Sequence, residues 1–558
     1  MKILCGVVLA FSLAGVAGSI LPAAHAGEVA WSQRAANAAM ERWPDGADAL
    51  LAGLDAEWLN TVDLRTFNFI KSAVDRVVSV DGSIVAVKAE EKPKGDALLG
   101  RELLRLYGVT QDKRYYTAAT EIYRQIMQQQ SSGAEGLPQA RHGEAAFIAE
   151  YAATFHHPEA FGGITARFVR MSGGAARANE LGWAMTALVD AMPFYGEYDS
   201  GRETLLRLLR RDAEIAAGSQ DAQTGLWFEA GAKDKTASCL IVYALAKGIR
   251  LGYLPQRYAV NAERGFKGVA GELMLAGDAQ EAGAFLLAST EMENVQKAKL
   301  GRGQKVVVDA WFNSQMHADP TGQQIYFHYK WDDQSNNGYS LLGHIFGNFG
   351  AEKGTLYVAP TARNLQNAKV FIIASPDIPA KNPHPNYVQP EDGAELAAWV
   401  KSGGVLVLLA NDPANTDLNG FNRIAERFGI HFNSVLEKHV IGDQDELGKI
   451  AVAGGGAIFH DTHTLFMKDV CTITVTGSAK AALSEDGKIL MATAKYGKGT
   501  VFATVDPWIY NEYTDGRKLP ALYDNYAGGE ELARWILKQI PHDAANGTGK
   551  SRSATPAR

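Results

Sequence analysis

The fold is decided by residues 236–254, which read TASCLIVYALAKGIRLGYL. Small residues open the stretch, a long apolar run follows, and Lys247, Gly248 and Arg250 mark its end. Small polar residues at the start, with basic residues and glycine at the end, are typical of an α-helix that begins and ends within the stretch. The stretch therefore predicts an apolar helix within a helical region of the protein.

The first 26 residues have the pattern of a cleaved signal peptide. Lys2 supplies a positive charge, residues 3–21 are apolar and uncharged, and Ala24-His25-Ala26 provides a cleavage site of the A-x-A type. A membrane anchor is the alternative, but glycine, serine and alanine dilute the apolar run and a cleavage site follows it. We therefore expect a periplasmic or secreted protein with no membrane segment after cleavage.

Composition excludes some classes of function. The 558 residues carry a formal net charge of −7 and a sequence pI of about 6.0, which argues against nucleic-acid binding. A chain of this length is expected to contain two or more domains. After cleavage only Cys239 and Cys471 remain, and they fall in different halves, so no disulfide framework is expected. The oligomeric state is left open.

Residues 28–296 have the pattern of helices joined by short loops. Apolar side chains recur at three- and four-residue spacing in 97–107, 115–127, 182–191, 203–217, 237–251 and 281–293. Repeated helical hairpins of this kind predict an all-α toroid whose loops frame a mouth for a ligand. A helical solenoid used for binding has the same periodicity, so the pattern leaves both architectures open.

Residues 305–540 change to an α/β pattern after a glycine-marked linker at 297–304. Strands are predicted at 305–310, 370–374, 404–409, 471–476 and within 492–505, and helices at 340–349 and 391–401. Apolar strands that alternate with helices indicate a mostly parallel sheet covered on both faces, of flavodoxin-like type. The small, polar and basic tail, 541–558, is expected to be disordered.

Several segments of the helical half resemble one group of glycosidases. They are 182–190 (GWAMTALVD), 221–227 (DAQTGLW), the opening stretch and 285–293 (FLLASTEME), in that order along the chain. Together they resemble the unsaturated rhamnogalacturonyl hydrolases of glycoside hydrolase family 105, which are related to family 88. This resemblance implies an (α/α)6 toroid, complete or lacking some hairpins. It also implies a glycoside hydrolase that removes 4,5-unsaturated uronic acid from acidic oligosaccharides made by lyases, such as those from pectin or rhamnogalacturonan.

The resemblance implies which carboxyl groups do the chemistry. In the family an aspartic acid protonates the double bond, water adds at C5 and the hemiketal collapses, without a metal or cofactor. Asp96, which stands shortly before Gly100-Arg101, matches the first acidic position of the family. The second position, a Trp-Leu-Asp-Gly motif in the family, has no aspartate here, and Glu144 is the nearest downstream carboxyl group. The alternative for both residues is an ordinary position in the first turn of a helix, where a carboxylate interacts favourably with the helix dipole.

Four further residues are expected to bind the acidic oligosaccharide. Arg177 offers a planar, bidentate partner for a uronate carboxylate. Trp183 and Trp227 lie in family-like segments and are candidates for stacking on a sugar ring, and His142 is a candidate for a further contact. Each also has a structural interpretation: a solvated arginine, core tryptophans, and a surface or cap histidine.

The α/β half resembles the glutamine-amidotransferase-like domain that follows some of these barrels. The resemblance rests on 326–333 (YFHYKWDD), 375–385 (SPDIPAKNPHP) and 505–513 (VDPWIYNEY). An active amidotransferase needs a nucleophilic cysteine where a strand turns sharply into a helix, whereas the predicted strand that ends at Leu409 continues with alanine and asparagine. We expect the loops around Trp331 and Trp508 to meet at the carboxyl edge of the sheet. There they either form a carbohydrate crevice or seal the contact with the helical half.

Two functions remain open from the sequence. The first is hydrolysis of unsaturated uronyl oligosaccharides. The second is a catalytically impaired barrel, retained for carbohydrate binding or as a scaffold for the α/β half. The unmatched aspartate and the short segment 172–176 favour this second function.

Overall fold

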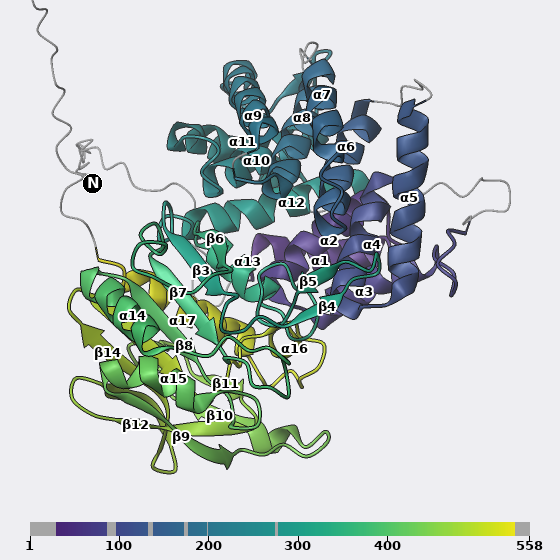
Figure 1. The fold of residues 1–558 in the computed structure, drawn as a ribbon. Helices are drawn as coiled ribbons and strands as arrows, with labels where there is room; N and C mark the ends of the chain where they lie inside the picture. Colours follow the sequence, from purple (N-terminus) through teal and green to yellow (C-terminus); the bar gives the residue numbers. More distant parts are fainter. Residues whose placement is uncertain are drawn as a thin grey trace, which may run out of the picture.

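The computed structural model describes residues 29–85, 96–131, 138–171, 177–197, 199–273 and 277–541. In this part of the chain a helical domain, 31–297, is followed by an α/β domain that begins at residue 305 (Figure 1). The predicted signal peptide and the tail from residue 542 lie outside the described residues, as do the side chains of residues 138–142. None of the described helices is both long and apolar enough to cross a bilayer.

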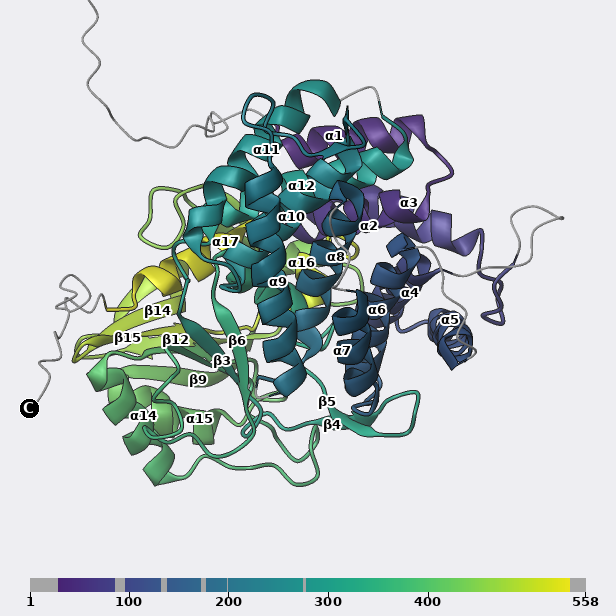
Figure 2. The ribbon, with the colours of Figure 1, turned by 90° about the horizontal axis from the view of Figure 1, so that it is seen from above.

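The helical domain is a ring of six inner helices packed inside six outer helices, and the two kinds alternate along the chain (Figure 2). The inner helices contact one another in the closed order α2, α4, α6, α8, α10, α12 and back to α2. The ring is therefore complete, and the alternative of a toroid that lacks hairpins is wrong. The bounds are α1 Trp31–Arg42, α2 Asp48–Thr61, α3 Leu64–Asp75, α4 Ala97–Thr110, α5 Lys113–Ser131, α6 Pro138–Thr154, α7 Ala160–Met171, α8 Ala178–Ala191, α9 Ser200–Ser219, α10 Lys235–Arg250, α11 Ala259–Leu273 and α12 Ala279–Lys297, with a small hairpin of β1 Phe228–Glu229 and β2 Ala232–Lys233.

Local signals in the sequence set the ends of the inner helices. The Asp234 carboxylate accepts the Ala237 backbone N–H at the start of α10, the helix of the opening stretch. Asp96 caps α4 in the same way, and its Oδ1 accepts the N–H groups of Leu98 and Leu99, each at 2.9 Å. Carboxylates at N-caps satisfy backbone donors that have no partner within the helix.

Two glycines let α2 and α12 approach closely enough to close the ring. A Cβ atom built on Gly53 would lie 2.6 Å from the carbonyl oxygen of Gly283, and one built on Gly283 would meet the backbone of Ala49 and Leu50. Neither position has room for a methyl group unless a helix backbone moves. Ring closure therefore depends on the absence of side chains at this crossing.

The α/β domain is built on one mixed sheet of nine strands, in the order β6-β3-β7-β8-β15-β14-β12-β9, with β13 paired to β14. The first five strands are parallel, in chain order 2-1-3-4-5, which is the order of flavodoxin-like sheets, and the remaining pairs are antiparallel. Helices α14 and α15 pack together on one side of the sheet, and α13 and α17 pack together on the other (Figure 1). The bounds are β3 Lys305–Asp309, β4 Met316–Ala318, β5 Gln324–Tyr326, α13 Ser340–Asn348, β6 Glu352–Leu356, β7 Val370–Ala374, α14 Pro390–Ser402, β8 Val405–Leu409, α15 Leu418–Ala425, β9 Ile430–Glu437, β10 Lys449–Val452, β11 His463–Phe466, β12 Val470–Val475, β13 Lys480–Glu485, β14 Lys488–Tyr496, β15 Gly499–Thr504, α16 Asn511–Thr514 and α17 Asn525–Lys538.

The loops that carry Trp331 and Trp508 meet beyond the parallel strands, as the sequence predicts. The Asn511 N–H donates to the Gly338 carbonyl oxygen at 2.9 Å. The two tryptophans, however, are only 4% and 0% exposed, and the Trp331 indole donates to a backbone carbonyl 2.8 Å away. Both belong to the core of the α/β domain. The expectation that they offer faces to a sugar, or seal the contact with the helical half, is wrong.

The two domains meet where inner helices end. The Tyr526 hydroxyl of α17 donates to the Leu59 carbonyl oxygen of α2 at 2.7 Å, and Lys297 pairs with Glu530 at 2.9 Å. Helix α13 contacts both α2 and α12. The α/β domain thus covers one end of the helical ring.

Substitution of Gly283 by alanine should destabilise the protein by about 1–3 kcal/mol, since a methyl group in this crossing overpacks it. The matched control is Gly163→Ala on α7, where a Cβ atom meets nothing within 4 Å. Because alanine has a higher helix propensity than glycine, the control should be stabilised by up to about 1 kcal/mol. Urea unfolding measures the free energy of unfolding of both variants. Equal changes in the two variants would contradict the tight packing of α2 against α12.

Candidate active site

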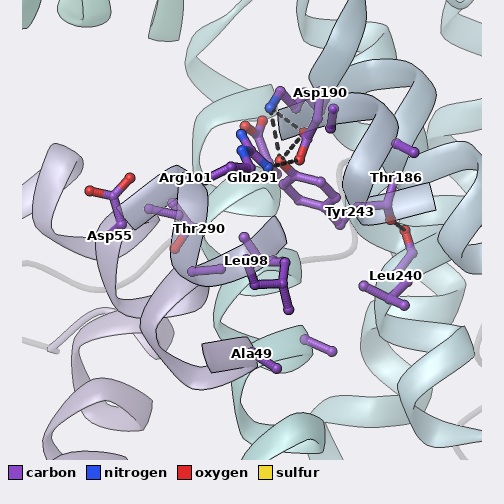
Figure 3. Close-up of a pocket in the computed structure, with 18 of the residues that line it drawn as sticks. Ala49, Asp55, Leu98, Arg101, Thr186, Asp190, Leu240, Tyr243, Thr290 and Glu291 are labelled. Carbon is purple, nitrogen blue, oxygen red and sulfur yellow. Dashed lines mark hydrogen bonds and ion pairs between the residues drawn. The ribbon is translucent and has the colours of Figure 1, made fainter. Parts of the chain in front are cut away.

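A cavity of about 210 Å³ lies inside the ring. Every inner helix contributes to its wall, and His344 of α13 contributes from the α/β domain. Figure 3 shows lining side chains that converge on the cavity from several helices. One part of the wall is formed largely by small and apolar residues, including Ala49, Leu98, Gly143, Trp183 and Ala284. Another part carries ionisable side chains, which are Asp55, Arg101, Glu102, Arg105, Glu150, Asp190, Lys247, Arg250 and Glu291.

The helices that line the cavity give its two ends different polarity. Helices α2, α4, α10 and α12 carry the residues that contact the α/β domain in their last turns, so their first turns face the other end. Backbone N–H groups at helix starts are not used within the helix and favour a negatively charged ligand. We call this end the mouth; Asp48 directly precedes the lining residue Ala49, and Asp96 stands two residues before the lining residue Leu98.

Two carboxyl groups meet at the mouth. Asp48 is the first residue of α2 and interacts with Asp96, the exposed N-cap of α4. Burial, followed by the charge of Asp96 and hydrogen bonding with its side chain, raises the pKa of Asp48 from 3.8 to about 7. Asp48 therefore keeps its proton up to near neutral pH and can act as an acid beside the Asp96 carboxyl group.

Paired charges run round the inner wall of the ring. Arg101 of α4 lies 2.9 Å from a Glu150 oxygen of α6 and 2.7 Å from an Asp190 oxygen of α8 (Figure 3). Asp190 also accepts from the Lys247 ammonium and the Tyr243 hydroxyl of α10, each at 2.7 Å. Burial alone would raise the pKa of Asp190, but Lys247 and Arg101 hold it well below its ordinary value. The Asp190 carboxylate and the Arg101 guanidinium therefore connect the inner helices α4, α6, α8 and α10.

Two further pairs extend this network to the remaining inner helices. Arg105 of α4 contacts Asp55 of α2 at 3.0 Å. Arg250 of α10 forms a bidentate pair with Glu291 of α12, at 2.7 and 2.5 Å. We call the set the charged belt; its members are Asp55, Arg101, Arg105, Glu150, Asp190, Lys247, Arg250 and Glu291. Cations and carboxylates are equal in number, so the belt is close to neutral overall.

Glu102 is a lining carboxyl group outside the charged belt. It is 3% exposed, and its Oε2 has no hydrogen-bond partner among the described residues. Burial raises the pKa of Glu102 well above its ordinary value, Asp55 adds to the shift, and Arg105 opposes it. Its surroundings therefore favour the protonated form of Glu102.

The structure does not bring Glu144 to the cavity. Its neighbour Gly143 lines the wall, but the Glu144 carboxylate forms an ion pair with Arg167 of the outer helix α7. That pairing occupies the carboxylate between α6 and α7. The backbone of His142 is part of α6, and its side chain lies outside the described residues.

The three remaining predicted residues lie in different surroundings. Trp183 lines the cavity from α8. Arg177 precedes α8 with its side chain 73% exposed, and its Nε lies 3.9 Å from a Glu229 oxygen. Trp227 is 1% exposed and donates its indole N–H to the Ala216 carbonyl oxygen at 2.8 Å. The expectation that Trp227 stacks on a sugar is wrong, because both faces belong to the core of the helical domain.

Sequence reasoning missed Asp48 and Glu102. Asp48 stands at the start of a helix after Trp43-Pro44 and a glycine-containing turn, which is a local signal for a helix start and not for a site. Its role emerges only because the ring places it beside Asp96. Among the described residues, no three His, Cys, Asp or Glu side chains are grouped as metal ligands would be.

Comparisons with known proteins agree with the helical architecture. Residues 176–294, which span α8 to α12, match the family model of Glycosyl Hydrolase Family 88. The resemblance to glycoside hydrolase family 88 is thereby confirmed for this segment. It includes Trp183 and the belt residues Asp190, Lys247, Arg250 and Glu291.

Solved structures similar to this chain include glycosidases of the same two families. A family 105 glycoside hydrolase of C. acetobutylicum is 20% identical, with 48% of this chain and 99% of that chain covered and a TM-score of 0.43. A family 88 glycosyl hydrolase from Bacteroides vulgatus is 14% identical, with 48% and 98% covered and a TM-score of 0.39. A possible family 105 member from Salmonella enterica is 15% identical, with 44% and 81% covered and a TM-score of 0.38.

The raised pKa of Asp48 predicts how stability depends on pH. The folded protein holds this proton up to about pH 7, whereas the unfolded chain releases it near pH 3.8. The Asp48 contribution to stability is therefore complete below about pH 4 and is lost as pH rises towards 7. The melting temperature of the wild type minus that of Asp48→Asn should fall across this range and then level off. Asp45→Asn, which changes an exposed carboxyl group in the preceding turn, is the control; a pH-independent difference for Asp48→Asn would contradict the raised pKa of Asp48.

Proposed function

We propose that the protein is a glycoside hydrolase that removes 4,5-unsaturated uronic acid from acidic oligosaccharides released by lyases. The observation that carries the proposal is the Asp48–Asp96 pair, which stands next to the lining residues Ala49 and Leu98 of the cavity in a six-hairpin ring. The Family 88 match of residues 176–294 supports the substrate class. The signal-peptide pattern of residues 1–26 supports action in the periplasm or outside the cell.

The carboxyl pair can supply both halves of an acid–base reaction. Asp48 donates its proton to C4 of the double bond, and Asp96 takes a proton from the water molecule whose oxygen bonds to C5. The hemiketal at C5 then opens and releases the saturated sugar. The proton gained by Asp96 restores the single proton of the pair, so the enzyme returns to its starting state. These steps need no metal or cofactor.

The wall of the cavity offers suitable contacts for such a sugar. Trp183 presents an aromatic surface near the start of α8, and helix starts at the mouth favour the uronate carboxylate. Ion pairs of the charged belt supply both donors and acceptors for hydroxyl groups further inside. Arg177 remains a candidate for the carboxylate, because its side chain is exposed.

An amidotransferase activity of the α/β domain has less support. Strand β8 ends at Leu409 and continues with Ala410, so no cysteine stands at that turn. Cys471 lies within β12, and burial raises the pKa of its thiol. A buried thiol with a raised pKa is a poor nucleophile.

Turnover should remove the ultraviolet absorbance of the C4=C5 bond in lyase digests of pectin or rhamnogalacturonan. Asp48→Asn and Asp96→Asn should each lower kcat by about 10²- to 10⁴-fold, the usual contribution of general acid–base catalysis. Glu144→Gln should keep most of the activity, since its carboxylate pairs with Arg167. If Glu144→Gln loses activity and Asp48→Asn does not, Glu144 is the donor. Oligosaccharide binding by the wild type without turnover would instead support the impaired barrel.

The rate should also report the protonation of Asp48. Since Asp48 must carry its proton to donate it, kcat/KM should fall as pH rises through about 7. Stopped or continuous absorbance assays between pH 5 and 9 measure this limb, with the Asp45→Asn variant as control. A rate that is constant across neutral pH would exclude Asp48 as the acid.

A further inference from the structure

The α/β domain contributes to the inner end of the cavity. His344 of α13 lines the cavity together with Asn294 of α12. The His344 Nε2 lies 2.8 Å from the Asn60 Oδ1 of α2, and Asn60 Nδ2 donates to Asn294 Oδ1 at 3.1 Å. These residues from both domains form the floor, at the end opposite the mouth.

The chemistry of His344 suits a sugar hydroxyl group. Burial and the nearby cations Arg250 and Lys353 lower its pKa well below the ordinary value, so the imidazole is neutral. Asn60 Oδ1 can only accept, which places the proton of His344 on Nε2. Nδ1 is then an acceptor and has no hydrogen-bond partner among the described residues. Because His344 is half-buried and lines the cavity, this acceptor is available to a ligand.

The charged belt is also held from the α/β side. The Arg250 guanidinium that pairs with Glu291 donates to the Gly347 carbonyl oxygen of α13 at 3.2 Å. Arg105, paired with Asp55, donates to the Gln334 side chain at 2.5 Å. The α/β domain therefore helps to orient Arg250 and Arg105, two cations of the cavity wall.

We propose that the α/β domain completes the substrate site, with His344 as a binding residue that accepts a hydroxyl hydrogen bond from the sugar at the floor. The inference rests on the proposed function for the identity of the sugar. The α/β domain then sets how deep a sugar can lie in the cavity.

The test compares three full-length variants with the wild type, using the unsaturated disaccharide from rhamnogalacturonan lyase digestion as probe. His344→Phe keeps a ring but removes both nitrogens, and should raise KM about tenfold with little change in kcat, since loss of uniform binding appears in KM. His344→Gln restores a donor and an acceptor and should recover part of the affinity. Asn348→Ala is the matched control, because Asn348 donates to the same Asn60 oxygen at 3.0 Å but does not line the cavity.

Each outcome decides the inference. A raised KM in His344→Phe, partly rescued by glutamine and absent in Asn348→Ala, supports a direct contact. Equal changes in His344→Phe and Asn348→Ala, or none in His344→Phe, would overturn it. If the wild type binds the disaccharide without turnover, the proposed function fails. The contact of His344 with the sugar is then tested by calorimetric Kd values of the same variants, where His344→Phe should bind more weakly than Asn348→Ala. A wild type that neither binds nor converts the probe overturns both proposals.

Discussion

The charges inside the ring have to be neutralised by one another, and the rest of the helical domain depends on this constraint. A charge removed from water is costly unless a partner and hydrogen bonds replace the solvent. The belt meets the requirement with contacts that cross from helix to helix: α2 to α4, α4 to α6 and α8, α8 to α10, and α10 to α12. Asn60 and Asn294 make the remaining contact between α2 and α12. Polar pairing thus follows the same closed path as apolar packing.

The two ends of the cavity have different chemistry because only the charged belt between them has to neutralise its own charges. At the mouth, Asp96 is exposed to solvent, and Asp48 beside it has a raised pKa. At the floor, neutral amide and imidazole groups from two domains replace solvent. A ligand that carries its charge at one end and its hydroxyl groups along its length matches this order.

Much of the fold was predictable from the sequence, since helix ends and strands depend on local signals. Asp96 as an N-cap, the apolar helix around Cys239 and the parallel strands all follow from residue type and spacing. The site was less predictable because inner helices are buried on nearly every side: in α8 most residues are buried, both those that line the cavity and those that pack in the core. Periodicity therefore could not separate Trp183, which lines the cavity, from Trp227, which does not. Nor could it place Glu144 against Arg167, or bring Asp48 to Asp96, since both contacts arise between helices.

The belt also restricts how such a protein can change over evolutionary time. Asp190 pairs with two cations and Arg101 with two carboxylates, so loss of Asp190 leaves Lys247 without its ion pair, and loss of Arg101 leaves Glu150 without one. Such a loss typically costs about 3–5 kcal/mol, a large share of the stability of a folded domain. Substitutions in the belt must therefore come in compensating pairs, which single mutational steps seldom supply. New substrate specificities would arise first at the mouth and at the floor, where residues are not part of the ion-pair network. The wall between them would stay the same.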